Sequence, residues 1–206
     1  MSVFAVAGLG LCLHTGCATP GLKKTGAPRA SSSAHCTAGS CPNTVPAMAP
    51  PGGEAKLAAP VADRERGYLG LPGGAADFVL SDVRADVLIV DLFDMYCHVC
   101  QKTAPKVNAL FALLEKRGYG GRIKMIGVAV GDTPLEAETF RRKFQVPFPV
   151  LADRVKAVSA EFGNEKRPCL LVLKKREGRL SVIFSHTGSI DDIEATLEAI
   201  LKAAGP

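Results

Sequence analysis

The sequence contains no tryptophan, and aromatic residues make up only 6% of its 206 residues. Charges of one sign never run for five residues and the net charge is only +5, which argues against a nucleic-acid-binding surface. The longest apolar stretch, near residues 3–13, is shorter than the ~20 residues that a membrane-spanning helix needs. Collagen, coiled-coil and multi-pass membrane folds are therefore excluded, whereas 47% hydrophobic residues are enough for one globular domain.

The first residues have the composition of an export signal. Residues 1–16 carry no charged side chain, and the apolar stretch is followed by His-Thr-Gly and Cys17. A short apolar core followed by small residues is typical of a secretory signal. This segment resembles the signal of bacterial lipoproteins, in which the cysteine becomes the lipidated first residue. We therefore expect a periplasmic protein of the bacterial cell envelope, anchored to a membrane through a lipid on Cys17. The alternative is an ordinary apolar N-terminus with an unmodified cysteine.

Residues 17–66 have a different composition. Of these 50 residues, 27 are Ala, Pro, Gly or Ser, and none is aromatic. Such a segment buries too little apolar surface to offset its chain entropy, so it predicts a disordered tether that leads to a folded head, residues 67–206. The tether holds Cys36 and Cys41, which can form a second disulfide. That disulfide is either incidental or a second redox pair on a flexible arm.

The head alternates between strand and helix patterns. Residues 87–93 are a continuous apolar run of strand length, as in a sheet that is covered on both faces. The order of the elements predicts an α/β fold with a central mixed sheet and helices on both faces. The expected strands are 87–93, 123–130, 148–151, 169–175 and 180–185, and the expected helices are 98–117, 134–144, 154–162 and 190–203, the last capped by Ser189.

A Cys-His-Val-Cys motif, Cys97 to Cys100, stands where the first buried strand ends and a helix begins. A C-x-x-C in this context indicates a redox pair. The free N–H groups and partial positive charge of a helix N-terminus favour the thiolate form of Cys97. Cys100 lies one turn further on and is expected to be more buried. The alternatives are half of a zinc site or two core cysteines, but a structural zinc site needs four ligands and the chain has no second such pair.

The neighbours of this motif resemble the thioredoxin superfamily over roughly residues 70–203. Leu88 to Cys97 is similar to that family's central strand and its approach to the active site. The resemblance implies a thioredoxin-like fold in which Asp91 is a buried acid that exchanges a proton with Cys100, with a pKa raised by desolvation. It also implies that Pro168 is a cis-proline lying against the disulfide, where it leaves backbone groups free for an extended substrate. Pro105 and Gly188 match the family's helix-kinking proline and its glycine after the last strand.

An insertion distinguishes the chain from thioredoxin itself. Residues 131–164 add a helix, a strand and a second helix before Pro168, which resembles the TlpA and ResA branch of thiol-disulfide oxidoreductases and the related peroxiredoxins. A thioredoxin-fold peroxidase remains an alternative, although a peroxiredoxin carries P-x-x-x-T-x-x-C around its attacking cysteine and this chain has Leu-Phe-Asp-Met-Tyr-Cys. The branch implies protein thiols and disulfides as partners, such as apocytochromes or a membrane electron donor.

Three residues near the motif depart from the family pattern and are candidates for substrate binding. Tyr96 replaces a tryptophan, His98 stands where proline or glycine is usual, and Arg167 precedes Pro168. Positive charge at His98 or Arg167 favours a thiolate at Cys97, which makes the disulfide more oxidising. The family analogy favours a reductant, so the direction of electron flow stays open.

The remaining cysteine and histidine leave one further alternative. Cys169 follows Pro168 and is expected to be an inert core residue, with a role as a third thiol as the alternative. Two cysteines and His186 also allow a copper-handling module of the Sco type, although those proteins resemble C-x-x-x-C. We expect a monomer that needs no metal and no cofactor beyond the Cys97–Cys100 disulfide.

Overall fold

The computed structural model describes residues 52–205, and within them five strands form a mixed sheet in the order β5-β4-β3-β6-β7. The central strand β3 pairs in parallel with β4, which pairs in parallel with β5, whereas β6 and β7 form an antiparallel hairpin against β3. The expected α/β architecture is therefore confirmed. The strand bounds are β3, Val87–Phe93; β4, Ile123–Val130; β5, Val150–Asp153; β6, Cys169–Arg176; and β7, Arg179–Thr187.

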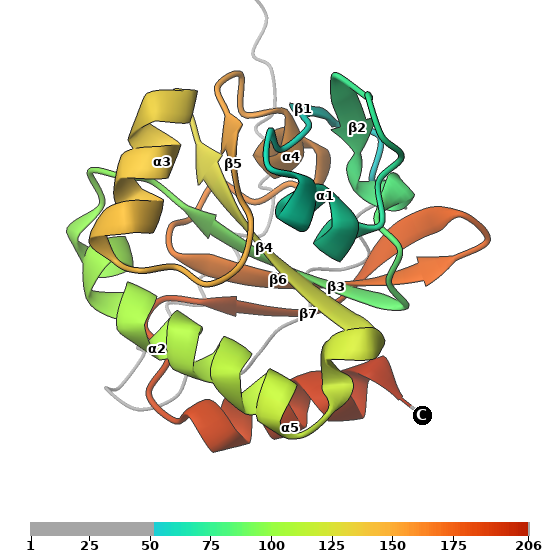
Figure 1. The fold of residues 1–206 in the computed structure, drawn as a ribbon. Coiled ribbons are helices and arrows are strands. Elements are labelled where there is room, and N and C mark those ends of the chain that lie inside the picture. Colours follow the sequence, from blue (N-terminus) through green and yellow to red (C-terminus); the bar gives the residue numbers. More distant parts are fainter. Residues whose placement is uncertain (1–51, 206) are drawn as a thin grey trace, which may run out of the picture. The chain divides into compact units, whose positions relative to one another are not determined.

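Helices cover both faces of this sheet (Figure 1). On one face, α2 and α5 lie side by side, and α3 packs into the same core. On the other face lie α1, α4 and a small antiparallel sheet of β1 and β2. The bounds are β1, Lys56–Ala58; α1, Asp63–Leu69; β2, Asp77–Val79; α2, His98–Lys116; α3, Pro134–Lys143; α4, Ala157–Glu161; and α5, Ile193–Ala204, with short 3-10 turns at Leu80–Asp82 and Tyr119–Gly121.

The alternation along β3 explains why the whole strand is apolar. Ile89 and Phe93 point into the core under α2, whereas Leu88 and Leu92 point into the core under α1 and α4. Successive side chains of a strand lie on opposite faces, so a strand covered on both sides needs apolar residues at nearly every position. The exception is Asp91, which shares the face of Ile89 and Phe93 and is 7% exposed.

The folded head begins earlier than the composition predicted. Leu57 in β1 is 3% exposed in the core, and β1 pairs with β2. Gly52 exchanges two backbone hydrogen bonds with Leu180, of 2.8 and 2.9 Å. The Glu161 carboxylate accepts the N–H groups of residues 53, 54 and 55. Residues 52–66 are thus part of the head and not of a disordered tether, because backbone pairing compensates for their few apolar side chains.

The start of the last helix differs from the prediction, and the predictions for the first 51 residues cannot be compared with the structure. The last helix begins at Ile193 and not at residue 190, because the Asp192 carboxylate, and not Ser189, accepts the N–H of Ala195. The predictions for the signal segment, Cys17, the Cys36–Cys41 pair and the rest of the tether up to residue 51 lie outside the described residues. From residue 52 to residue 205, no helix combines the length and apolarity that crossing a membrane requires.

Candidate active site

Cys97 occupies the N-cap position of α2, immediately after the loop that leaves β3. Its sulfur accepts the backbone N–H of Cys100 at 3.2 Å. The Cys97 side chain is half-buried and Cys100 is 2% exposed, and both are free thiols. Cys97 is thus the more accessible of the two thiols, and its sulfur lies at the helix N-terminus, where it accepts a backbone N–H.

Cys100 is held as a protonated thiol. Burial raises its pKa well above the ordinary value, and the hydrogen bond that its thiol donates to Cys97 and the nearby charge of Asp91 raise it further. A thiol of this kind is a poor nucleophile toward an outside partner, because it is both inaccessible and protonated. It lies one helical turn from Cys97, where it can attack a disulfide formed there.

Asp91 lies on the same face of β3 as the core that contains Cys100. Burial raises the pKa of Asp91 to about 7. A carboxyl group with this pKa exchanges protons readily near neutral pH, and its charge acts directly on the Cys100 thiol. The structure therefore has a buried carboxyl group with a raised pKa at the position that the sequence predicted.

Pro168 comes from another part of the sequence and directly precedes β6, which pairs with β3 near the end of β3 that leads to Cys97. The Arg167–Pro168 peptide bond is cis, as the resemblance implied, and the Pro168 carbonyl accepts the N–H of Gly188 at 2.9 Å. Cys169, the next residue, pairs with Leu92 near the end of β3, just before the loop to Cys97. The Arg167 guanidinium donates to the carbonyls of Asn164 and Lys166 in its own loop.

The loop between β3 and Cys97 is held by two acidic residues that sequence reasoning missed. Tyr96 is 68% exposed, and its hydroxyl donates to Glu136 at 2.7 Å. The N–H of Met95 donates to the buried carboxylate of Asp132 at 2.8 Å. A Thr-x-x-Glu capping box from Thr133 to Glu136 is visible in the sequence, but it predicts only the start of α3 and not the contact with Tyr96.

His98 is exposed in the first turn of α2, where it borders a shallow hollow with Gln101, Lys102 and Phe144. His98, which lines this hollow, directly follows Cys97 in the sequence. Of the three expected substrate-binding residues, Tyr96 and His98 are therefore accessible next to Cys97, whereas Arg167 is half-buried and bonded to its own loop.

Cys169 lies on the opposite face of the sheet from Cys100. It is 1% exposed and belongs to the core under α1 and α4, and its sulfur accepts hydrogen bonds from Asn164 at 2.8 Å and Thr187 at 3.7 Å. Burial raises the pKa of this thiol. A buried, protonated thiol on the far face fits the expected core residue and not a third partner in exchange.

A copper-handling module, the alternative left by the sequence, would need a cluster of metal ligands, and the described part of the chain contains none. The Nε2 atom of His186 lies 3.0 Å from the carbonyl oxygen of Ser189. Among residues 52–205, no three His, Cys, Asp or Glu side chains gather in a way that could hold a metal ion. Cys97 and Cys100 are free thiols, and the Cys100 N–H donates to the Cys97 sulfur.

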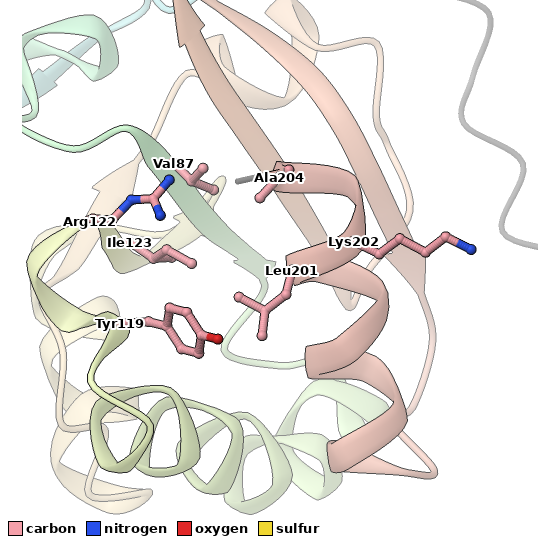
Figure 2. Close-up of a pocket in the computed structure, with 8 residues that line it drawn as sticks. Val87, Tyr119, Arg122, Ile123, Leu201, Lys202 and Ala204 are labelled. Atoms are coloured by element: carbon pink, nitrogen blue, oxygen red, sulfur yellow. The ribbon is translucent and has the colours of Figure 1, made fainter.

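A cavity of about 440 Å³ lies where β3 and β4 begin, at the opposite end of these strands from Cys97 (Figure 2). Val87 and Ile123, which line it, are the first residues of β3 and β4, whereas Cys97 follows the end of β3. The ring of Tyr119 and the side chain of Leu201 complete its apolar wall, and none of its lining residues is a cysteine. This cavity is therefore separate from the thiol site.

The sequence matches a known protein family and two relatives that are named for thiol-disulfide chemistry. Residues 69–193 match the family model of AhpC/TSA, which is more than half of the chain. The chain belongs to the AhpC/TSA family. Two of its relatives are named thiol-disulfide oxidoreductase ResA. That of Geobacillus thermodenitrificans is 28% identical over 136 residues, covering 61% of this chain and 75% of the relative. That of Geobacillus kaustophilus is 28% identical over 121 residues, covering 59% and 67%.

Solved structures show the same fold as this AhpC/TSA member. The DsbE-type thiol:disulfide interchange protein from Chlorobium tepidum superposes with a TM-score of 0.51 at 24% identity, covering 65% of this chain and 91% of that one. DsbF from MTB superposes with a TM-score of 0.50 at 21% identity, covering 62% and 87%. The thioredoxin-like fold that the sequence predicted is thereby confirmed.

Proposed function

We propose that this AhpC/TSA family member is a thiol-disulfide oxidoreductase that exchanges disulfides with extracytoplasmic proteins through Cys97 and Cys100. The observation that carries the proposal is the asymmetry of the pair. Cys97 is accessible at the N-terminus of α2, where the N–H of Cys100 donates to its sulfur, and the Cys100 thiol is buried behind it. Its relatives named thiol-disulfide oxidoreductase support the same chemistry.

In the reducing direction, the Cys97 thiolate attacks one sulfur of a partner disulfide. A mixed disulfide forms, and the second partner sulfur leaves as a thiolate. The Cys100 thiol then passes its proton to the Asp91 carboxylate and attacks the Cys97 sulfur. The Cys97–Cys100 disulfide forms and the first partner sulfur leaves, so two electrons have moved to the partner. The same steps in reverse oxidise a partner dithiol.

The proposal includes a location and a class of partner. The apolar start of the chain and Cys17 support export and a lipid anchor, which would place a monomeric head in the periplasm beside apocytochromes or a membrane electron donor. Tyr96 and His98 flank Cys97 on the exposed surface and are the side chains that a partner would meet. Membrane fractionation of cells tests the anchor. Cys17→Ser should move the protein from the membrane fraction to the soluble fraction. A variant that stays in the membrane fraction would contradict lipidation.

An insulin-reduction assay with dithiothreitol tests the activity. Cys97→Ser should reduce turnover at least 100-fold, because the other two thiols among residues 52–205, Cys100 and Cys169, are buried, whereas Cys169→Ala should change it by less than about twofold. Hydrogen peroxide, offered as an alternative substrate, should be consumed much more slowly than insulin is reduced. Normal insulin reduction by Cys97→Ser would contradict the proposal, and faster turnover of peroxide would favour the peroxidase alternative.

A further inference from the structure

Helix α3, at the start of the 131–164 insertion, holds the residue that precedes the nucleophile. The Tyr96 hydroxyl donates to Glu136 Oε1 at 2.7 Å, a contact between residues 40 positions apart in the sequence. One residue earlier, the Met95 N–H donates to Asp132 at 2.8 Å. The approach to Cys97 is thus fixed by side chains of the insertion and not only by β3 and α2.

Glu136 is itself fixed by the cap of its helix. Its Oε2 atom accepts both the N–H and the hydroxyl of Thr133 at 2.7 Å, and its own N–H donates to Thr133 at 3.3 Å. These bonds leave Oε1 for Tyr96 and restrict the carboxylate to one orientation. They also lower the pKa of Glu136 to about 2, while the contact with Glu136 raises the pKa of Tyr96. In the neutral pH range Glu136 is therefore a carboxylate that can accept and Tyr96 a phenol that can donate.

The Tyr96 ring stands on the surface that a partner must meet. It is 68% exposed beside Cys97, Val99 is 48% exposed on the other side, and Leu135 next to Glu136 is 76% exposed. Exposed apolar side chains that lie close together often mark an interaction surface. Five large hydrophobic side chains are exposed among residues 52–205. Three of them belong to the loop before Cys97, to α2 and to α3. An extended protein segment that presents a disulfide to Cys97 would pack against this ring.

We propose that Glu136 is a positioning residue for protein substrates: it fixes the Tyr96 ring in the orientation that partner polypeptides contact. This inference rests on the proposed function and adds a role for the insertion. An aromatic ring that is already oriented loses less conformational freedom when a partner binds. A small disulfide does not need the ring and gains nothing from its orientation.

The test compares insulin with oxidised glutathione in steady-state reduction by the full-length chain. Tyr96→Phe removes only the hydroxyl, and Glu136→Ala removes its acceptor. Each should lower kcat/KM for insulin about threefold to tenfold, the range expected for freeing one side chain, and change kcat/KM for glutathione less than twofold. The double variant should match the single variants, because both remove the same hydrogen bond.

Matched variants separate positioning from charge and from helix fraying. Glu138→Ala removes a carboxylate from the same helix that bonds only to Arg141 and Arg142 and should leave both rates unchanged. Glu136→Gln removes the charge but can still bond Tyr96, so it should retain most of the insulin activity. Thermal unfolding of each variant monitors loss of the α3 cap.

Additive effects in the double variant, an equal loss with glutathione, or a Glu136→Gln variant as slow as Glu136→Ala would each overturn this inference. These outcomes leave the proposed function intact, since the wild-type chain still exchanges disulfides. Failure of the wild-type chain to reduce both substrates would instead contradict the proposed function.

Discussion

Asp91 is the residue on which the proton transfer of the proposed exchange depends. It becomes a carboxylate only as the pH rises through about 7, and only the carboxylate can accept the proton of Cys100. Asp91→Asn should therefore slow insulin reduction about 10-fold to 100-fold at pH 8 and much less at pH 5, where wild-type Asp91 is protonated as well. A pH profile of the reduction rate measures this. A variant that retains the wild-type rise near pH 7 would show that another group accepts the proton.

The same burial predicts how stability depends on pH. The pKa of Asp91 rises from its ordinary value of 3.8 to about 7 in the folded protein, so the folded state holds the proton more tightly than the unfolded chain does. The stability that this proton contributes is therefore full below about pH 4 and is lost as the pH rises to about 7. This shift corresponds to on the order of 4 kcal/mol.

Asp91→Asn should remove this dependence, because the amide stays neutral. The variant should be more stable than the wild type at pH 8 by on the order of 3 kcal/mol and nearly equal to it at pH 4. Urea unfolding at the two pH values measures the difference. An equal effect of the substitution at both values would mean that folding does not raise the pKa of Asp91.

At the scale of elements, the segment before α1 is part of the fold. Leu57 is buried and β1 pairs with β2, so a chain that starts at residue 67 loses both. A fragment of residues 52–206 should fold, whereas 67–206 should be less stable by at least about 3 kcal/mol, the cost of one buried leucine and several hydrogen bonds. Urea unfolding of the two fragments checks this, and equal stabilities would contradict it.

Glu161 links this segment to α4, since it accepts three backbone N–H groups of residues 53–55. Glu161→Ala should destabilise the chain by about 1–3 kcal/mol, because those donors lose a charged acceptor. Glu165→Ala, which removes an exposed carboxylate a few residues away, should have an effect below about 0.5 kcal/mol. Equal effects of the two substitutions in urea unfolding would show that Glu161 contributes only its charge.

Some elements of the fold could be predicted from the sequence and others could not. Strands 87–93 and 123–130 and the helix that follows Cys97 could be predicted, because continuous apolar runs and a motif at a strand end are local signals. Residues 52–66 could not, because backbone bonds to Leu180 and Glu161 hold a segment whose composition is poor in apolar residues. The contact of Glu136 with Tyr96 joins residues 40 positions apart, and no local pattern contains it.

At the scale of the whole molecule, the sheet brings together residues from three separated parts of the sequence. β3 and α2 supply Asp91, Cys97 and Cys100, β6 begins directly after Pro168, and the insertion supplies Glu136. The reactive pair stays on one face of the sheet and Cys169 on the other. In the proposed mechanism, Cys97 bonds to the partner and Cys100 releases it.

Trapping of the mixed disulfide tests this division between the two thiols. Reduced Cys100→Ser, mixed with insulin and quenched with acid, should accumulate a covalent adduct whose mass equals that of the protein plus insulin or one insulin chain, and peptide mapping should place the linkage at Cys97. Matched Cys97→Ser should form no adduct linked through Cys100, because this remaining thiol at the site is 2% exposed. An adduct linked through Cys100 in Cys97→Ser, or none in Cys100→Ser, would contradict the account.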